Sequence, residues 1–199
     1  MAICLCAGFM VGPLEGFADV WGAGFLKQVY CFESLVAASL ASMIFIGMCF
    51  GGPILSLISE RTNSCFGTII AAGLIMAIGF ILLLGTSLSS QNISIVFVII
   101  GVCSAYQIIA IYKTSTYVKE DLVGLTTAVA NMIIMIFGYI FHSVIGMVID
   151  ATGGVTNADA LSWGITTIPI GLILGSIGFT IIAITEYILR KRTLGTETI

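Results

Sequence analysis

Six long apolar stretches, separated by short polar connections, occupy almost the whole chain. At a rise of about 1.5 Å per residue, each stretch is long enough for a helix to cross a hydrocarbon core about 30 Å thick. The connections are too short to contain a soluble domain. The pattern predicts an all-α membrane protein in which residues 1–199 form a single six-helix transmembrane domain. The predicted spans are about 1–26, 34–58, 66–86, 93–112, 124–149 and 162–188.

The basic residues lie almost entirely on one side of these spans. Alternate connections of a six-span protein face opposite sides of the bilayer, and on one of those sides Lys27 is the only basic residue. The positive-inside rule assigns the side that is rich in Lys and Arg to the cytoplasm. We therefore expect a multi-pass protein of a cell membrane, with a bacterial inner membrane as the favoured setting and both termini cytoplasmic. The residues on the basic side are Arg61, Lys113, Lys119, Arg190, Lys191 and Arg192.

Composition agrees with this architecture and argues against several kinds of site. Hydrophobic residues make up 59% of the chain and charged residues 9%, against about 25% charged in a typical soluble domain. The basic residues form a rim at the membrane rather than a patch on a soluble domain, which argues against nucleic-acid binding. The six cysteines have no metal-ligand or disulfide-framework spacing, and His142 is the only histidine. We therefore expect no metal site and no cofactor.

Glycine, proline and polar residues divide the spans into two groups. The segment Gly12-Pro13-Leu14-Glu15-Gly16 interrupts the first span, and a kink is expected there because proline removes a backbone donor. The second and fifth spans carry glycines at helical spacing, which allow another backbone to approach closely. Spans one, two, four and five hold the polar groups and are expected to bound a polar interior. Spans 66–86 and 162–188 are expected to lie outside it and to face lipid.

The second and fifth spans also end alike, with a glycine ahead of an acidic residue at the helix exit. The first ending is Gly52-Pro-Ile-Leu-Ser-Leu-Ile-Ser-Glu-Arg61 and the second is Gly146-Met-Val-Ile-Asp150. If spans 1–3 and 4–6 are equivalent units, they have opposite topology in the membrane. Inverted repeats of this kind are a known plan of secondary transporters.

The connection between the second and third spans contains Ser56-Leu-Ile-Ser59-Glu60-Arg61. It resembles the loop motif of the major facilitator superfamily, which runs glycine, any residue, leucine, small residue, aspartate, arginine. Ser56 replaces the glycine and Glu60 replaces the aspartate, and the later glycine and basic residues of the motif are missing. These departures bear on the conformational latch that the motif forms in the family.

Two further segments resemble the C-terminal six-helix half of that superfamily, so the resemblance covers essentially the whole chain. Residues 124–131, Gly138 and residues 146–150 look like its penultimate helix, and residues 16–26 look like its seventh helix. The resemblance implies half of a secondary active transporter that moves a small solute by alternating access, as in a proton-coupled symport. It also implies a lipid bilayer as surroundings and a six-helix N-terminal half as partner.

Two acidic residues in the first span are the sharpest chemical signal. Glu15 and Asp19 are four residues apart, so they share one face if the helix continues through Gly16. A charged group at the middle of a span costs about 2.5–3.5 kcal/mol on insertion scales, and such groups usually face an interior cavity. Removal from water favours the protonated carboxyl, which makes Glu15 a candidate proton carrier. The structural alternative is an acid that is kept neutral, or one that is paired with a basic residue of a missing half.

Five further groups at membrane depth are candidates for contacts with a solute or a proton. They are Tyr106, Gln107, Asn131, Tyr139 and His142. Each has a structural alternative, because neutral hydrogen-bonding groups also hold helices together and a neutral histidine can pack against neighbouring glycines. The candidate binding residues are thus Glu15, Asp19, Tyr106, Gln107, Asn131, Tyr139 and His142, and the loop motif comprises Ser56, Glu60 and Arg61.

Two function classes remain open from the sequence. The polar residues of spans one, four and five favour a transporter half. The abrupt apolar start at Met1, which we interpret as a truncation or as one product of a split gene, and the altered loop motif favour a remnant or interaction subunit without transport of its own. An intramembrane enzyme is not expected, because no nucleophile motif with a catalytic partner appears.

Overall fold

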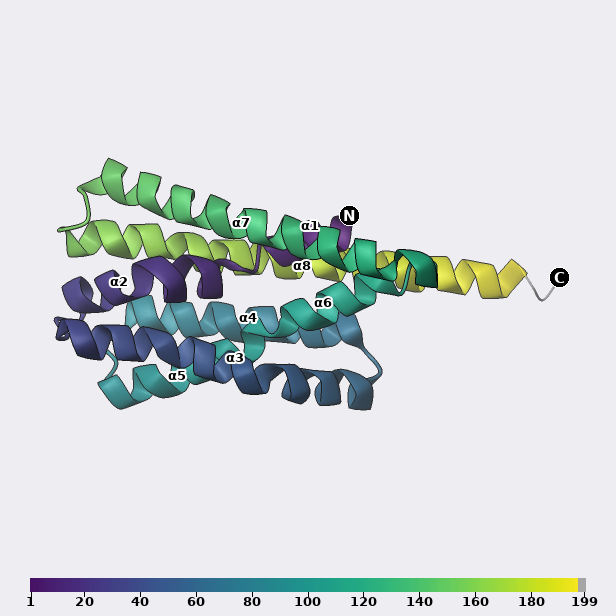
Figure 1. The fold of residues 1–199 in the computed structure, drawn as a ribbon, viewed down its shortest axis with the longest axis horizontal. Helices are drawn as coiled ribbons and strands as arrows, with labels where there is room; N and C mark the ends of the chain where they lie inside the picture. Colours follow the sequence, from purple (N-terminus) through teal and green to yellow (C-terminus); the bar gives the residue numbers. More distant parts are fainter. Residues whose placement is uncertain (197–199) are drawn as a thin grey trace.

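The computed structural model describes the backbone of residues 1–196, and side chains through Leu189 together with Lys191. Within this part of the chain the regular structure is helical, and six helical stretches are long and apolar enough to span a membrane. They run over Ala2–Val29, Ser34–Thr62, Cys65–Gly85, Ser90–Ser115, Glu120–Thr152 and Ala158–Leu189. Six long apolar helical stretches are therefore confirmed, and their ends differ by a few residues from the predicted spans. Figure 1 shows an elongated bundle from which the last helix projects at one end.

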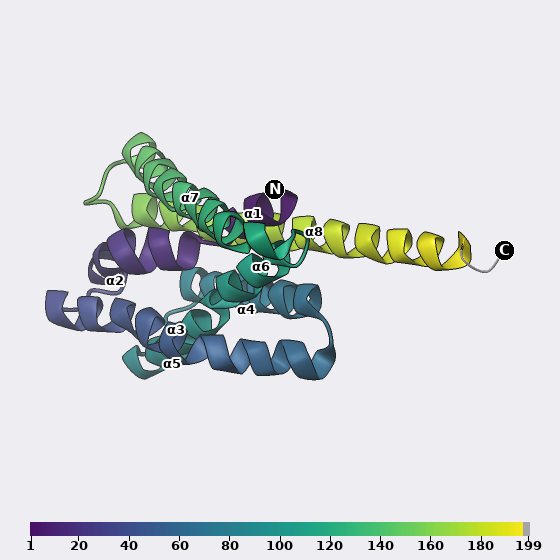
Figure 2. The same ribbon diagram turned by 45° about the vertical axis from the view of Figure 1, so that its right-hand side comes forward.

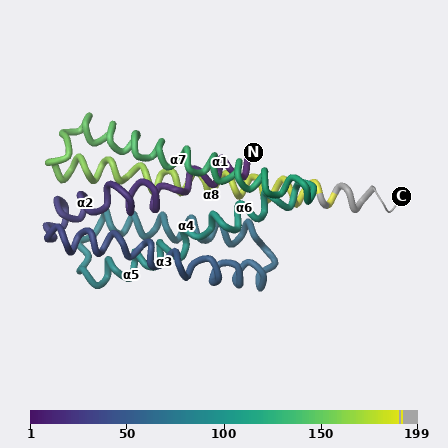
Figure 3. Tube along the Cα trace, viewed as in Figure 1, coloured from purple at the N-terminus to yellow at the C-terminus, as the bar shows by residue number. Residues whose placement is uncertain are grey.

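The first span is broken into three pieces. The helix α1 (Ala2–Gly8) stops short of the π-helix η1 (Gly12–Trp21), and α2 (Gly22–Val29) completes the span. The interruption is visible in the tube trace of Figure 3. The expected distortion is present at 12–16, because this segment is π-helical rather than α-helical. The interruption of the helix itself falls just before it, since Pro13 occupies the first turn of η1, where its missing N–H leaves no partner unsatisfied.

The fourth span carries a second break, which the sequence pattern did not predict. The helix α5 (Ser90–Ser104) ends at Ala105, and α6 (Tyr106–Ser115) begins directly after it. Neither proline nor glycine stands at this position, so no local residue announces the break. Spans one and four, the two broken ones, are also the two that are most buried inside the bundle.

Unbroken helices make up the remaining spans. They are α3 (Ser34–Thr62), α4 (Cys65–Gly85), α7 (Val123–Thr152), which follows the short 3₁₀ turn η2 (Glu120–Leu122), and α8 (Ala158–Thr196). The Ser64 hydroxyl caps α4 by accepting a hydrogen bond from the Gly67 amide. Gly153 ends α7 with a φ of +132°, a conformation that glycine adopts without strain.

Four pairings of helical segments make the most extensive contacts. The helix α3 lies along α5, α4 lies along α8, and α7 lies along α1 and η1 as well as α8. Figures 1 and 2 both place α7 and α8 on one side of the bundle and α3 and α5 on the other. Glycines set the closeness of the α3–α5 contact, because side chains added at Gly47, Gly51 or Gly101 would meet the backbone of the facing helix.

The burial of α4 differs in part from the expectation that this helix lies outside the bundle interior and faces lipid. The helix α4 (predicted as 66–86) is half-buried, more than α3 and α7, because it packs against the last helix and both pieces of span four. Only one of its sides, with Leu74, Ile78 and Ile81, is exposed and apolar, as expected of a lipid-facing surface. The helices α3 and α7 have the largest exposed faces in the bundle.

Candidate functional site

Glu15 lies in the π-helical segment of the first span, and its side chain packs against α7 at Gly138. A Cβ placed at Gly138 would lie 3.0 Å from both Cβ and Cγ of Glu15. The glycine therefore provides the space in which the acidic side chain rests. Within the described part of the chain, no hydrogen bond reaches the Glu15 carboxylate. π-Helical turns are rare, and they occur frequently at functional sites.

Glu15 interacts electrostatically with residues from three spans. Asp19, one turn further along η1, and His142 of α7 lie within electrostatic range of Glu15, and so does Tyr106 of α6. Asp19 is exposed, while Glu15 and His142 are half-buried. The structure thus brings three of the other six predicted residues near the Glu15 carboxylate, at the junction of spans one, four and five.

Tyr106 joins the two helix breaks. Its side chain is fully buried, and its hydroxyl donates a 2.6 Å hydrogen bond to the carbonyl of Ala7. Ala7 lies in the last turn before the break of span one, and Tyr106 is the first residue after the break of span four. The two interruptions therefore meet inside the bundle and are linked by a side chain.

Gln107 follows Tyr106 and has an incomplete set of hydrogen bonds. The residue is 6% exposed, and its amide nitrogen is buried with no partner among the described residues. Leaving a buried donor unsatisfied costs about 1–3 kcal/mol. Such a group in a native interior calls for an explanation, and a donor that is satisfied only when a ligand is bound provides one.

Asn131 and Tyr139 do not join this group. Both are exposed on α7, and Tyr139 is 75% exposed. Helical periodicity places them with His142 and Asp150 along one side of α7. This polar stripe, defined as Asn131, Tyr139, His142 and Asp150, runs along a helix whose other exposed side chains are mainly apolar.

The loop motif lies beside a cavity at the end of the bundle that carries Arg61 and Lys113. Ser56 and Glu60 are among the residues lining this cavity, whose volume is about 510 Å³, whereas Arg61 is exposed and does not line it. The cavity lies between the C-terminal part of α3, the start of α4 and α6. The full lining comprises Ser56, Ser59, Glu60, Asn63, Cys65, Ile108, Ile109 and Tyr112.

A polar clasp that the sequence did not reveal ties span four to α8 at the same end. Lys113 and Glu186 form a 3.0 Å ion pair, and the Tyr117 hydroxyl donates to the other Glu186 oxygen at 2.8 Å. The Lys113 ammonium also lies 4.9 Å from the Tyr117 ring centroid. Burial, followed by the adjacent Glu186 carboxylate, raises the pKa of the Tyr117 phenol. Residues 73 positions apart form the pair, so helix periodicity gives no sign of it.

The arrangement offers a carboxylate that accepts no hydrogen bond from the described residues, a nearby second acid and a histidine, all within helices that are long and apolar enough to cross a membrane. Among the described residues, no group of three or more His, Cys, Asp or Glu side chains is placed to hold a metal ion. A carboxyl group and an imidazole can exchange protons, and both can hydrogen-bond to a polar solute. Comparison with known families finds no family model that matches the chain, and comparison with curated proteins finds no match either.

Proposed function

We propose that the chain is one six-helix half of a secondary active transporter of the major facilitator type, with Glu15 as its proton-carrying group. The observation that carries this proposal is the Glu15 carboxylate, which lies in a broken, central span and accepts no hydrogen bond from the described residues. A carboxyl group in this position changes charge when the site is exposed to water on one side or the other. Uptake and release of that proton would couple solute movement to a proton gradient.

The location of the helix breaks supports the proposal. Secondary transporters build their sites from discontinuous helices near the bilayer midplane. Non-helical backbone at that depth is tolerated where protein or a water-filled cavity surrounds it. Both broken spans of this chain are central, and their breaks meet at the Tyr106–Ala7 hydrogen bond.

The pairing of helices supports two equivalent units, spans 1–3 and 4–6. If the two units are exchanged, spans one, two and three take the places of spans four, five and six, and the reverse. The contact between spans two and four then corresponds to the contact between spans five and one, and the contact between spans three and six corresponds to itself. These are the pairs formed by α3 with α5, by α7 with α1 and η1, and by α4 with α8. The two breaks also fall in exchanged spans. An internal two-fold arrangement of this kind agrees with an inverted repeat.

The exposed polar stripe of α7 indicates where a partner half would lie. Polar side chains that face lipid are costly, so they usually face a bundle interior or a cavity. A second six-helix unit covering the exposed sides of α3 and α7 would enclose Asn131 and Tyr139, and would close the space in front of Asp19. Alternating access then consists of the two units rocking about this shared site.

The test uses cells or proteoliposomes that contain this chain together with its six-helix partner half. Glu15→Gln preserves shape and hydrogen bonding but cannot release a proton. The variant is expected to lose accumulation of a labelled solute against its gradient, while exchange of labelled for unlabelled solute continues. Glu33→Gln, an exposed acid in a connection, serves as the matched control and is expected to retain accumulation.

Two outcomes would contradict the proposal. Undiminished accumulation by Glu15→Gln would remove Glu15 from the coupling step. Absence of both accumulation and exchange in the assembled parent, across a panel of sugars, organic acids, nucleosides and drugs, would favour an interaction subunit that does not transport.

A further inference from the structure

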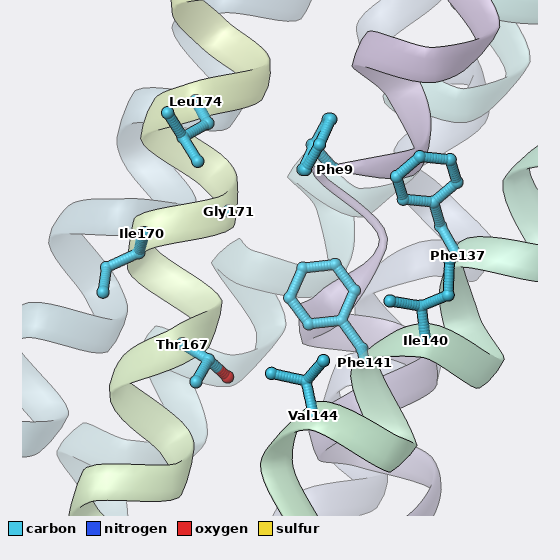
Figure 4. A pocket seen from close by; sticks show the side chains of 9 residues that line it. All are labelled: Phe9, Phe137, Ile140, Phe141, Val144, Thr167, Ile170, Gly171 and Leu174. Atoms are coloured by element: carbon cyan, nitrogen blue, oxygen red, sulfur yellow. The ribbon is translucent and has the colours of Figure 1, made fainter. Parts of the chain in front are cut away.

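An apolar groove opens between α7 and α8 beside the break of the first span. Its volume is about 260 Å³, and Figure 4 shows one wall on each helix with Phe9 between them. The one hydroxyl in the lining, that of Thr167, donates to the Gly164 carbonyl of its own helix. The lining residues are Phe9, Phe137, Ile140, Phe141, Val144, Thr167, Ile170, Gly171 and Leu174.

The groove opens onto an exposed, apolar surface formed by α7 and α8. The side chains at its mouth are between 39% and 54% exposed, and they belong to Ile140, Val144, Ile170 and Leu174. Helical periodicity places this groove on the side of α7 opposite to the polar stripe. A partner that satisfies the polar stripe would therefore leave the groove open, continuous with the lipid-facing surfaces of both helices.

The floor of the groove is the segment between α1 and η1. A Cβ at Gly171 would lie 2.8 Å from the Phe9 carbonyl oxygen, so the glycine allows α8 to touch this backbone. The Phe9 and Phe137 rings meet edge to face, with centroids 5.0 Å apart. Phe141 lies over Gly12, where a Cβ would be 2.9 Å from its Cε1 atom. Any occupant would thus contact the residues that flank the break.

We infer that this groove binds an acyl chain of a bilayer lipid, which packs against the break of the first span. The groove lies at mid-span depth in two helices that are apolar enough to cross the membrane. An apolar cavity of this kind stays free of water, and an empty one forfeits the dispersion contacts of its lining. Acyl chains are the apolar molecules present at that depth, and packing is the interaction that favours association there. This inference does not depend on transport.

The experiment measures quenching of tryptophan fluorescence by lipids brominated at mid-chain. Val144→Trp and Ile170→Trp place reporters on opposite walls of the groove, so that the loss of one variant through misfolding leaves the other. Ile78→Trp, on the exposed side of α4, is the lipid-facing control. Trp21 and Trp163 are replaced by Phe in all three variants. The full chain in detergent is titrated with brominated phosphatidylcholine.

The groove reporters are expected to be half-quenched at a lipid fraction about fivefold lower than the control, which corresponds to about 1 kcal/mol of preferential binding. Equal quenching curves at the groove and at position 78 would overturn the inference, because they indicate ordinary boundary lipid. Groove reporters that remain unquenched while the control is quenched would also overturn it, since a protein chain, such as a second copy, would then cover the groove. Neither result depends on whether Glu15 carries protons.

Discussion

At the scale of single residues, two tyrosines show how the same residue type acquires different roles. Sequence placed Tyr106 and Tyr139 in one set of candidates, because both lie at membrane depth. In the structure Tyr106 is fully buried and bonded to Ala7, while Tyr139 is 75% exposed on the outer surface of α7. The difference arises from the orientation of the helices and from the break at Ala105. Neither can be predicted from the hydropathy pattern of a single sequence.

Tyr106→Phe should therefore destabilise the bundle more than Tyr139→Phe. The buried hydroxyl of Tyr106 contributes one hydrogen bond, so its loss is expected to lower the free energy of unfolding by about 0.5–1.5 kcal/mol. Tyr139→Phe should change it by less than about 0.5 kcal/mol, as at other exposed positions. Unfolding of both variants in the same detergent provides the comparison. Equal effects would show that the Tyr106–Ala7 link does not hold the two breaks together.

Gln107 leads to the opposite expectation. Its amide nitrogen is buried and has no partner in the described part of the chain, so Gln107→Leu removes a buried polar group at little structural cost. The variant is expected to leave the free energy of unfolding unchanged or to raise it by about 1 kcal/mol. If Gln107 donates to a solute, the same variant should weaken solute binding by the assembled transporter, a loss of function without loss of stability.

Ser104→Ala is the matched control for Gln107→Leu. Its buried hydroxyl donates to the Ile100 carbonyl, so its removal is expected to cost about 0.5–1.5 kcal/mol. Destabilisation of Gln107→Leu as large as that of Ser104→Ala would mean that the Gln107 amide does have a partner in the folded chain.

At the scale of elements, glycine spacing was the most informative part of the sequence. The close approach predicted from the glycines of the second span is realised in the contact of α3 with α5. The partner glycine, Gly101, gave no separate signal, because one glycine in an apolar run has no period. The break at Ala105 was equally hidden. The break in span one was announced by Pro13, although the interruption falls before it.

Gly101→Ala tests this interface. The added Cβ would lie 2.8 Å from the carbonyl carbon of Ile44, which is backbone and cannot move aside without separating the helices. The free energy of unfolding is expected to fall by about 1–3 kcal/mol. Gly124→Ala is the matched control, because nothing lies within 4 Å of its added Cβ, and alanine favours a helix over glycine by up to about 1 kcal/mol. A neutral Gly101→Ala would show that the α3–α5 contact is looser than described.

At the scale of the whole molecule, hydropathy predicted the number and order of spans because each stretch must satisfy its own backbone in lipid. That constraint acts span by span, so it can be read from a single sequence. The grouping of Glu15, Asp19, Tyr106 and His142 depends on how three spans pack, and only the pairs within one helix were visible beforehand. The Lys113–Glu186 clasp, formed across two helices, was hidden for the same reason.

The orientation of the bundle in the membrane is a separate prediction, which rests on the distribution of basic residues. Arg61 and Lys113 lie at one end of the bundle, and Lys27 lies near the connection at the other end. The positive-inside rule places the Arg61 end in the cytoplasm. Two positions are suited to a test, since Thr62 and Ser87 are both exposed and lie in successive connections on opposite sides.

Thr62→Cys and Ser87→Cys, each on a background that lacks the six native cysteines, report this orientation directly. In intact cells, a membrane-impermeant maleimide is expected to label the cysteine at position 87 and not the one at position 62. After the cells are opened, both positions should react, which controls for buried or unreactive thiols. Labelling of position 62 alone in intact cells would reverse the orientation, placing both termini outside and Asp150 in the cytoplasm.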